Sequence, residues 1–350
     1  MVKFGIEFVP DTHPQKIVGY STLAEQGGFD YIWVTDHYCN RNPYIVLTAI
    51  AFATQKISLG TGVTNPYVIN PAWTASAVAS LDEVSGGRAI LGLGAGDKVT
   101  LASLGIAFLK PLSAIKESTE VIRKLWRGEV VKYKGRIVKL DGANLRYKPT
   151  REIPVYIGAQ GPRMLKLAGK IGDGVLINAS HPRDFEFAIK QIKIGAEEAK
   201  RDLATIDVTA YTSFSVDYDA EKAKTKAAPI VAFIVAGCPP EVLGKHDIPV
   251  EDASKIGKAL ADGKFGDAFG AVTDQMVDAF SIYGTPKDCI NKIRGLVKIG
   301  VTQIVVGSPI GPKKKNSIGI IAKEIIPEFK SQSYLKIGST YRAPDKHRLD

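Results

Sequence analysis

The sequence predicts an α/β protein built as a (β/α)8 TIM barrel with insertions. Apolar, strand-like runs alternate with helix-like stretches along most of the 350 residues, as they do in proteins with a parallel sheet. Eight such runs occur, which is the number that a barrel of this kind requires. A doubly wound sheet is the alternative, but its six-strand version would leave the last two strands without a place.

The predicted strands are short apolar or alternating runs bounded by glycine or polar residues. They lie at residues 3–9, 31–34, 57–61, 89–94, 155–157, 174–177, 208–216 and 303–306. Several of the helices between them have proline near the first turn or glycine after the last, as helix ends favour. These helices are predicted from the first strand to residue 26, over 43–54, 72–85 and 111–126, from 162 onward, and over 183–201, 286–299 and 318–325.

Two stretches depart from this alternation. Residues 130–138 form two β-rich arms about Lys134 and Gly135, which predicts a hairpin outside the main sheet. Residues 220–280 are mostly helical, which predicts an insertion. Because no linker rich in serine or proline divides the chain, residues 1–330 are predicted to form a single barrel domain with these two excursions. Residues 331–350 are polar and weakly patterned, and we expect an irregular C-terminal tail.

Composition narrows the classes of protein. The chain is 45% apolar, which is enough for a large core. It has no run of eighteen apolar residues, so no membrane-spanning segment is expected. Three scattered cysteines and an N-terminus that enters a strand directly suit a reducing cytoplasm, so a cytoplasmic protein is expected. Neither the cysteines nor the five histidines have the spacing of a metal site, so no metal is expected.

The net charge of +10 allows two interpretations. It can reflect a lysine-rich surface, or it can attract a small anionic ligand. Nucleic acid is not an expected partner, because the lysines are scattered and no basic–aromatic motif occurs. The one tight basic run, residues 313–315, is expected to cap the last helix.

Candidate site residues follow from the barrel itself, because barrels bind ligands at the carboxyl ends of their strands. Glu7 lies in an otherwise apolar first strand, where alternation with Phe4, Ile6 and Phe8 points it to the opposite face, toward the lumen. A carboxylate there is costly unless it is paired or functional. Glu7 is therefore either a buried salt-bridge partner or a general acid with a raised pKa.

Polar and glycine residues also end the next three strands. Asp36 and His37 end the second strand and either cap a helix or hydrogen-bond a ligand ring. Glycine-rich turns end the third and fourth strands, and glycine lets a ligand approach the backbone; these turns supply Thr61, Gly62, Val63, Asn65, Gly96 and Asp97. The spacing of Gly92, Gly94 and Gly96 is half of a dinucleotide fingerprint. We reject that interpretation, because Asp97 stands where a helix should accept a pyrophosphate. Asp97 is either a pocket carboxylate or a turn former.

A candidate phosphate site follows the fifth strand. Gly158, Ala159, Gln160 and Gly161 precede Pro162 and a predicted helix. Free N–H groups at a helix N-terminus attract anions. The alternative is an ordinary tight turn between strand and helix. Asn178 and Ala179, at the end of the sixth strand, are expected to lie beside this turn.

At these strand ends the chain resembles the bacterial luciferase-like superfamily, and within it the coenzyme F420-dependent oxidoreductases. The resemblance covers nearly the whole chain to about Pro327. It is carried by YIWVTDH at 31–37, ISLGTGVTNP at 57–66, SGGRAILGLGAGD at 85–97, PVYIGAQGPRMLKLAGKIGDGVLIN at 154–178 and YGTPKDCINKI at 283–293. The opening VKFGIEFVP and the GAGD loop are most similar to the methylenetetrahydromethanopterin reductases of methanogenic archaea.

That resemblance implies a barrel that binds coenzyme F420 and no metal. It implies hydride transfer from reduced F420 to a tetrahydromethanopterin-type one-carbon carrier, converting 5,10-methylenetetrahydromethanopterin to the methyl form, and assembly into homodimers or homotetramers. It also implies a non-prolyl cis peptide near Gly62–Val63, against the deazaflavin. We therefore predict Glu7 or Asp97 as the proton donor, and cofactor binding by Asp36, His37, Thr61, Gly62, Val63, Asn65, Gly96, Gly158, Ala159, Gln160, Gly161, Asn178 and Ala179.

The chain departs from the F420-dependent sugar-phosphate dehydrogenases. It has Asn40, Arg41 and Asn42 where those enzymes carry a tryptophan, and Asp97 where they carry a glutamate. Sugar oxidation is therefore a weaker hypothesis than oxidation of a secondary alcohol by a related F420 enzyme. An FMN-dependent luciferase-like monooxygenase and a non-catalytic flavin-binding or light-emitting relative remain alternatives.

Overall fold

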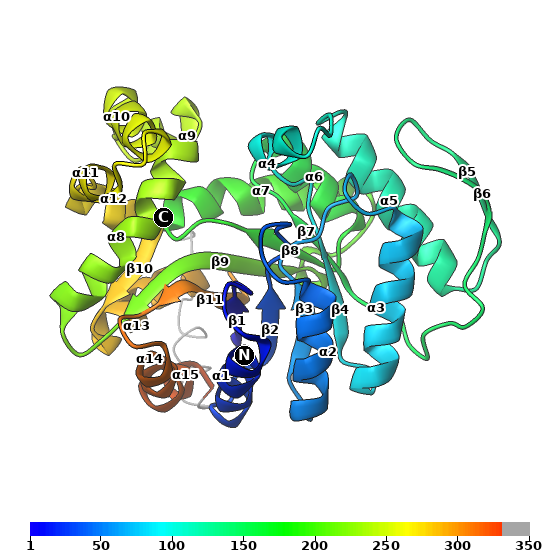
Figure 1. Cartoon of the computed structure of the whole chain (residues 1–350), viewed down its shortest axis with the longest axis horizontal. Coiled ribbons are helices and arrows are strands. Elements are labelled where there is room, and N and C mark those ends of the chain that lie inside the picture. The colour runs from blue at the N-terminus through cyan, green and yellow to red at the C-terminus, as the bar shows by residue number, and fades with distance from the viewer. Residues whose placement is uncertain (331–350) are drawn as a thin grey trace, which may run out of the picture.

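The computed structural model describes residues 1–330; the expected C-terminal tail, 331–350, lies outside that range. Within it, eight parallel strands close into the predicted barrel (Figure 1). They are β1 (Lys3–Phe8), β2 (Tyr31–Val34), β3 (Ser58–Thr61), β4 (Ala89–Leu93), β7 (Val155–Gly158), β8 (Gly174–Ile177), β9 (Asp207–Val216) and β11 (Gln303–Ile310). The pairing order is β9-β11-β1-β2-β3-β4-β7-β8, and β8 pairs with β9 to close the ring.

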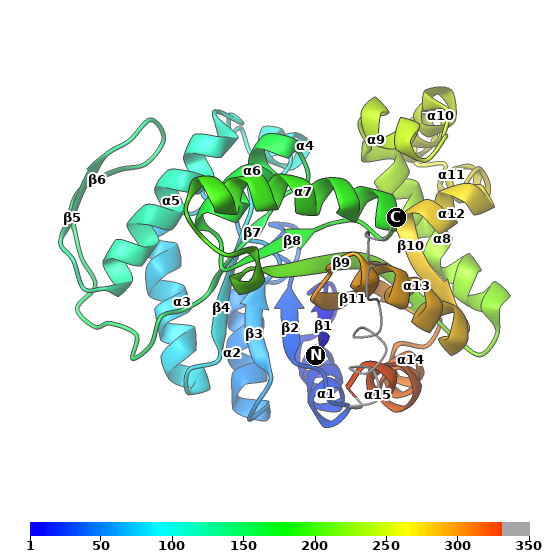
Figure 2. The ribbon, with the colours of Figure 1, turned by 180° about the vertical axis from the view of Figure 1, so that it is seen from behind.

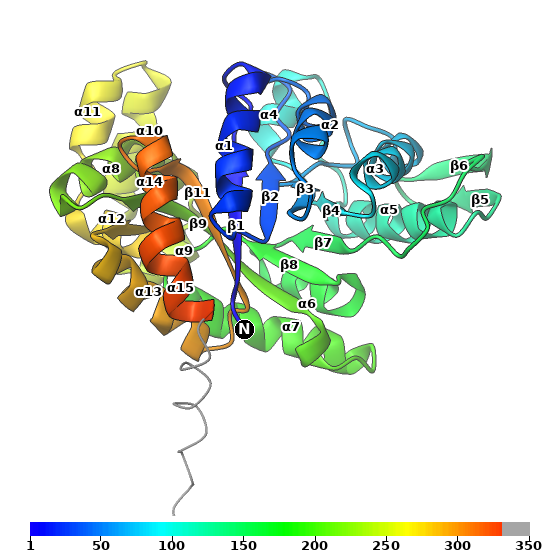
Figure 3. The ribbon, with the colours of Figure 1, turned by 90° about the horizontal axis from the view of Figure 1, so that it is seen from below.

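Helices cover the outside of the barrel, with α6 and α7 side by side at the back (Figure 2) and α14 packed beside α1 (Figure 3). Proline stands in the first turn of most of them, where its missing N–H costs nothing. The helices that alternate with the strands are α1 (Pro14–Gln26), α2 (Pro43–Ala53), α3 (Pro71–Ser85), α5 (Pro111–Trp126), α6 (Pro162–Ile171), α7 (Pro182–Glu198), α13 (Pro286–Lys298), and α14 (Lys314–Ile320), which a π-helical turn joins to α15 (Ile326–Lys330).

The two excursions lie at opposite ends of the molecule (Figure 1). At one end, β5 (Val131–Lys134) and β6 (Lys139–Ala143) form an antiparallel hairpin, whose second strand begins one residue beyond the predicted range. The carboxylate of Glu117 fixes the turn of this hairpin by accepting the backbone N–H groups of three residues between β5 and β6. At the other end are α8 (Ala220–Gly237), α9 (Pro240–Lys245), α10 (Val250–Ala261), α11 (Phe265–Gly270) and α12 (Asp274–Phe280), which share a separate apolar core.

Three short elements were not predicted. The strand β10 (Ser281–Gly284) pairs in parallel with the last four residues of β9. Its four residues follow a helix directly, so no long apolar run marks it. The helix α4 (Lys98–Ser103) begins immediately after Asp97, and a single 3-10 turn spans Leu203–Thr205. No helix within residues 1–330 is both long and apolar enough to cross a membrane.

Polar side chains close the N-terminal end of the barrel interior. Asp207 accepts hydrogen bonds from the Tyr156 hydroxyl at 2.8 Å and from Nε2 of Gln303 at 2.9 Å. The Oε1 atom of Gln303 in turn accepts from the indole N–H of Trp33 at 3.1 Å. Trp33 fits the lumen because a Cβ at Gly60 would lie only 2.6 Å from its ring. This end of the barrel is therefore packed, and its buried Asp207 carboxylate and Gln303 amide are hydrogen-bonded.

Candidate active site

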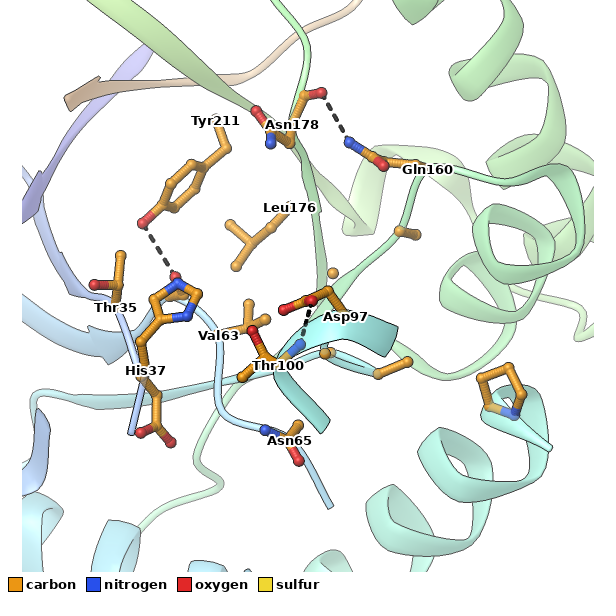
Figure 4. A pocket seen from close by; sticks show the side chains of 18 of the residues that line it. Thr35, His37, Val63, Asn65, Asp97, Thr100, Gln160, Leu176, Asn178 and Tyr211 are labelled. Carbon is orange, nitrogen blue, oxygen red and sulfur yellow. Dashed lines mark hydrogen bonds between the residues drawn. The ribbon is translucent and has the colours of Figure 1, made fainter. Parts of the chain in front are cut away.

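A cavity of about 530 Å³ lies at the C-terminal ends of the barrel strands, where a barrel is expected to bind its ligand. Figure 4 shows its wall, with Tyr211 of β9 facing Val63 and Leu176. Most of the predicted site residues line it: Glu7, Asp36, His37, Gly62, Val63, Asn65, Gly96, Asp97, Gly158, Ala159, Gln160 and Asn178. Residues from separate strands, far apart along the chain, thus meet at one site.

Three predicted residues lie outside that wall. Thr61 is buried, and its hydroxyl donates to the Gly92 carbonyl at 2.8 Å, so it ties β3 to β4 beneath the cavity. Gly161 is the N-cap of α6. Ala179 lines a groove of about 640 Å³ that adjoins the cavity and shares His37, Asp97, Gln160 and Asn178 with it.

The cavity floor is backbone. The Gly62–Val63 peptide is cis, as the resemblance implied. A Cβ at Gly94 would lie 2.5 Å from the Val63 side chain, and one at Gly92 would lie 1.9 Å from the Thr61 carbonyl oxygen. The glycines of the fourth strand therefore make room for the turn that follows the third strand. The lack of a side chain at these glycines allows two parts of the protein backbone to pack closely together. The sequence analysis had instead predicted that such glycines let a ligand approach the backbone.

Glu7 reaches the cavity from β1, partly buried in the barrel wall. Its Oε2 atom accepts the Ser308 backbone N–H at 2.8 Å. Burial raises the pKa of Glu7, and the hydrogen bonds from Ser308 and Tyr211 and the charge of Lys314 only partly oppose that effect. A carboxyl group with a raised pKa at a cavity wall is suited to general acid chemistry.

Asp97 has a different environment. Its Oδ1 atom caps α4 by accepting the Thr100 N–H at 2.8 Å (Figure 4). Burial acts to raise the pKa of Asp97, but hydrogen bonds from Thr100 and Val99 and the charge of His37 outweigh it and lower that pKa. Asp97 is thus both a cavity carboxylate and a helix cap, and it favours the ionised state.

Asp36 and His37 lie on the cavity side of β2. Burial raises the pKa of Asp36, and the nearby polar Thr64 side chain and the charge of His37 only partly oppose that effect. Tyr44 lies behind this group, and its pKa is also raised, first by burial. The residues that follow β2 therefore offer the cavity a carboxyl group and an imidazole, backed by the buried Tyr44.

Several residues that line the cavity were not predicted from the sequence. Tyr211 lies in a strand whose alternation was recognised, with Ala210 and Phe214 turned to the outer core. The same alternation could have placed Tyr211 in the lumen. Thr35 also lines the cavity, and its buried hydroxyl has no hydrogen-bond partner within residues 1–330. The other additions are Gly94, Ala95, Thr100, Leu101, Phe108, Pro111, Met164 and Leu176.

The turn after β7 forms one side of the cavity. Gly158, Ala159 and Gln160 line it, and Gln160 Nε2 donates to the Asn178 carbonyl at 3.1 Å, which holds two strand ends together (Figure 4). The ten-residue helix α6 starts directly afterwards. Backbone N–H groups and a helix N-terminus are thus available here for an anionic group.

The adjoining groove is largely apolar. The insertion supplies Ile230, Phe233 and Val242, and α7 supplies Phe187. Lys245 and Asp184 add charge to its edge. No group of three or more His, Cys, Asp or Glu side chains in the part of the chain that the structure describes could hold a metal ion. Cavity and groove together can accept two organic ligands in contact.

Residues 3–303 match the model of the luciferase-like monooxygenase family. The chain belongs to this family, which confirms the superfamily expected from its motifs. It is 54% identical over 333 residues to a 5,10-methylenetetrahydromethanopterin reductase of Archaeoglobus fulgidus, covering 94% of this chain and 100% of that protein. A reductase of the same name from Methanolobus tindarius is 55% identical, with 92% and 99% covered.

A solved structure gives the same result. The coenzyme F420-dependent tetrahydromethanopterin reductase of Methanopyrus kandleri superposes with a TM-score of 0.92 at 48% identity, covering 94% of this chain and 99% of that one. The similarity includes both the barrel and the region of the insertion, because so little of either chain is left out.

Proposed function

We propose that this protein is an oxidoreductase that transfers a hydride from reduced coenzyme F420 to 5,10-methylenetetrahydromethanopterin, giving the 5-methyl form in methanogenesis or its reverse. The observation that carries the proposal is the partly buried acid Glu7 beside the backbone floor at Gly62–Val63, in a chain 54% identical to a reductase of that name. The pterin is the one-carbon carrier on which the enzyme acts.

The residues present fit F420. A cavity of about 530 Å³ suits a tricyclic ring, and the unpartnered Thr35 hydroxyl offers it a hydrogen bond. We assign the ring to the floor at Gly62–Val63, with Asp36, His37, Asn65 and Gly96 around it and Thr61 supporting the floor from below. The phosphate belongs beside Gly158, Ala159, Gln160 and Gly161, with Asn178 and Ala179 on the far side. When bound, reduced F420 supplies a hydride from C5 of its deazaflavin.

Glu7 is the better proton donor of the two candidates. Opening the methylene bridge breaks a C–N bond, and the departing nitrogen must take up a proton as that bond's electron pair moves to it. Burial raises the pKa of Glu7, so it retains its proton to higher pH than an ordinary glutamate and is suited to donate one. Asp97 is held ionised by its role as the α4 cap and is better suited to position a ligand.

Turnover can be tested by absorbance. The protein is mixed with reduced F420 and methylenetetrahydromethanopterin, and the band of oxidised F420 is followed. Its appearance only when the pterin is present supports the proposal. A yellow protein as isolated, which consumes oxygen with reduced FMN and leaves the pterin unchanged, would favour a monooxygenase instead. F420 reduction by a secondary alcohol without pterin activity would favour the alcohol dehydrogenase alternative.

We also propose that the chain forms homodimers or homotetramers. Large apolar side chains stand exposed on neighbouring helices: Ile45 and Phe52 on α2, and Trp73 on α3, each at least two thirds exposed. Exposed apolar groups on adjacent elements typify protein interfaces. Light scattering should give a dimer or larger for the unmodified chain, and Trp73→Glu should reduce the mass; a monomeric unmodified chain would contradict this.

We also propose a cytoplasmic location, because of the state of the three cysteines. Cys39, Cys238 and Cys289 are all free thiols in the structure. Free thiols suit a reducing compartment.

A further inference from the structure

The hydroxyl of Tyr211 stands between two acceptors of the cavity wall. It lies 3.4 Å from the Gly62 carbonyl oxygen, to which it donates (Figure 4). On its other side lies the side chain of Glu7, which lines the same cavity and whose charge acts on the phenol. A phenol carries one proton, so it can donate to only one of these acceptors at a time.

Glycines leave room in the backbone for the side chains of Tyr211 and Glu7. A Cβ at Gly62 would lie 2.5 Å from the Tyr211 hydroxyl, so this close approach requires a glycine there. A Cβ at Gly307 would lie 2.9 Å from Oε2 of Glu7, the atom that accepts the Ser308 N–H. The hydrogen bond to Gly62 is long, and a long hydrogen bond is weak and readily exchanged.

The direction of donation depends on whether Glu7 carries a proton. Protonated Glu7 has an O–H of its own, which can donate to the Tyr211 oxygen while Tyr211 donates to Gly62. Ionised Glu7 can only accept. The phenolic proton then gains more by turning toward the carboxylate, because hydrogen bonds to charged groups are the stronger ones.

We propose that Tyr211 is a positioning residue, whose hydroxyl turns from the Gly62 carbonyl to the Glu7 carboxylate as Glu7 gives up its proton. This inference rests on the proposed role of Glu7. The Glu7 proton moves to the departing nitrogen, the O–H electron pair stays on the carboxylate, and the phenolic proton remains on Tyr211 throughout. Tyr211 thus stabilises the charge that proton donation creates, and couples that event to the peptide at the cavity floor.

The titratable groups that face Glu7 come from two elements that pack near it. Tyr211 faces it from β9 and Lys314 from α14. Lys314 is itself influenced by Asp11, Lys16 and Lys226 on the surrounding loops and helices. Because Lys314 is unchanged in a Tyr211→Phe variant, a changed titration of Glu7 in that variant reports the phenol alone.

The first test uses ligand-free protein. The C=O stretching band of the Glu7 carboxyl group is identified in pH-difference infrared spectra by its loss in Glu7→Gln. Tyr211→Phe should move the midpoint of that band to higher pH, because the charged form has lost a donor. The matched control is Tyr156→Phe, which removes another barrel hydroxyl bonded to a carboxylate, that of Asp207. Tyr156→Phe should leave the midpoint where it is.

The second test uses turnover. Tyr211→Phe should lower kcat about tenfold, roughly the loss of one hydrogen bond to a charged group. It should also move the alkaline limb of the pH profile to higher pH, which a merely structural defect would not do. In a Glu7→Gln background, Tyr211→Phe should cause no further loss.

The outcomes separate the two proposals. An unchanged Glu7 midpoint in a folded Tyr211→Phe variant would overturn the inference. A fall in F420 affinity with the midpoint and the pH profile unchanged would overturn it as well. A moved midpoint in a protein that does not reduce the pterin would support the assignment of Tyr211 and remove the proposed function.

Discussion

At the N-terminal end of the barrel interior, Asp207 accepts hydrogen bonds from Tyr156 and Gln303. At the C-terminal end, Glu7 lines an open cavity together with Tyr211, whose phenol donates to a backbone carbonyl. Both ends pair a carboxyl group with a tyrosine. At one end the carboxylate is fully partnered and the lumen is packed, while at the other the acid has a raised pKa and space in front of it. The same side-chain types therefore support the fold at one end and, in the function we propose, the chemistry at the other.

The largest expected effect on stability comes from a substitution that disrupts the packed end of the barrel. Asp207→Ala leaves the Tyr156 hydroxyl, the Gln303 amide and the Lys3 ammonium without their acceptor. Losing one member of such a network should lower the free energy of unfolding by about 3 kcal/mol. Chemical denaturation measures this loss. Turnover per folded molecule should stay within about twofold, and a fall beyond about tenfold would show that the two ends are not separate in function.

The second prediction concerns the open end of the barrel, where Glu7 should make stability depend on pH. Because the pKa of Glu7 is raised by folding, the folded state holds this proton more tightly than the unfolded state does. That advantage is complete below the unfolded pKa and is lost as the pH rises through the folded pKa. Glu7→Gln cannot ionise, so it should be more stable than the unmodified chain at alkaline pH, by roughly 0.5–2 kcal/mol. Unfolding curves across pH test this, and a Glu7→Gln variant that is less stable at alkaline pH would contradict it.

The smallest effect concerns the second cavity carboxylate. Asp97→Ala removes the cap of α4 and should lower stability by about 0.5–1 kcal/mol. Since the pKa of Asp97 is lowered by folding, its contribution is present above the unfolded pKa and is lost as the pH falls through the folded pKa. The stability difference between the two proteins should therefore vanish in acid. A difference that persists there would mean that Asp97 stabilises α4 by packing.

Sequence reasoning was strongest where one local pattern determines one element. The alternation of apolar runs with helices, marked by proline and glycine at their ends, predicted the barrel. The elements it missed, β10 and α4, span four and six residues and are defined by their neighbours. For elements of this length, local propensity carries little information.

The site shows the same division. Strand ends could be predicted, because a barrel brings them to one face, and most residues named there line the cavity. The roles of Thr61 and Gly94 could not, since they depend on which backbone atoms of the adjacent turn approach them. Tyr211 was missed because alternation gives the face of a ten-residue strand but not the depth at which a side chain meets Glu7.

The central claim is that the open end holds the acid, and single-turnover kinetics test it most directly. Glu7→Gln and Asp97→Asn are loaded with reduced F420, mixed with methylenetetrahydromethanopterin, and followed by the absorbance of oxidised F420. We predict that Glu7→Gln slows the step by about 10²–10⁴-fold, the usual contribution of a general acid, with its Kd for F420 within about threefold of the unmodified value and with Asp97→Asn slowed by less than about tenfold. A Glu7→Gln variant that turns over at nearly the unmodified rate would contradict the account.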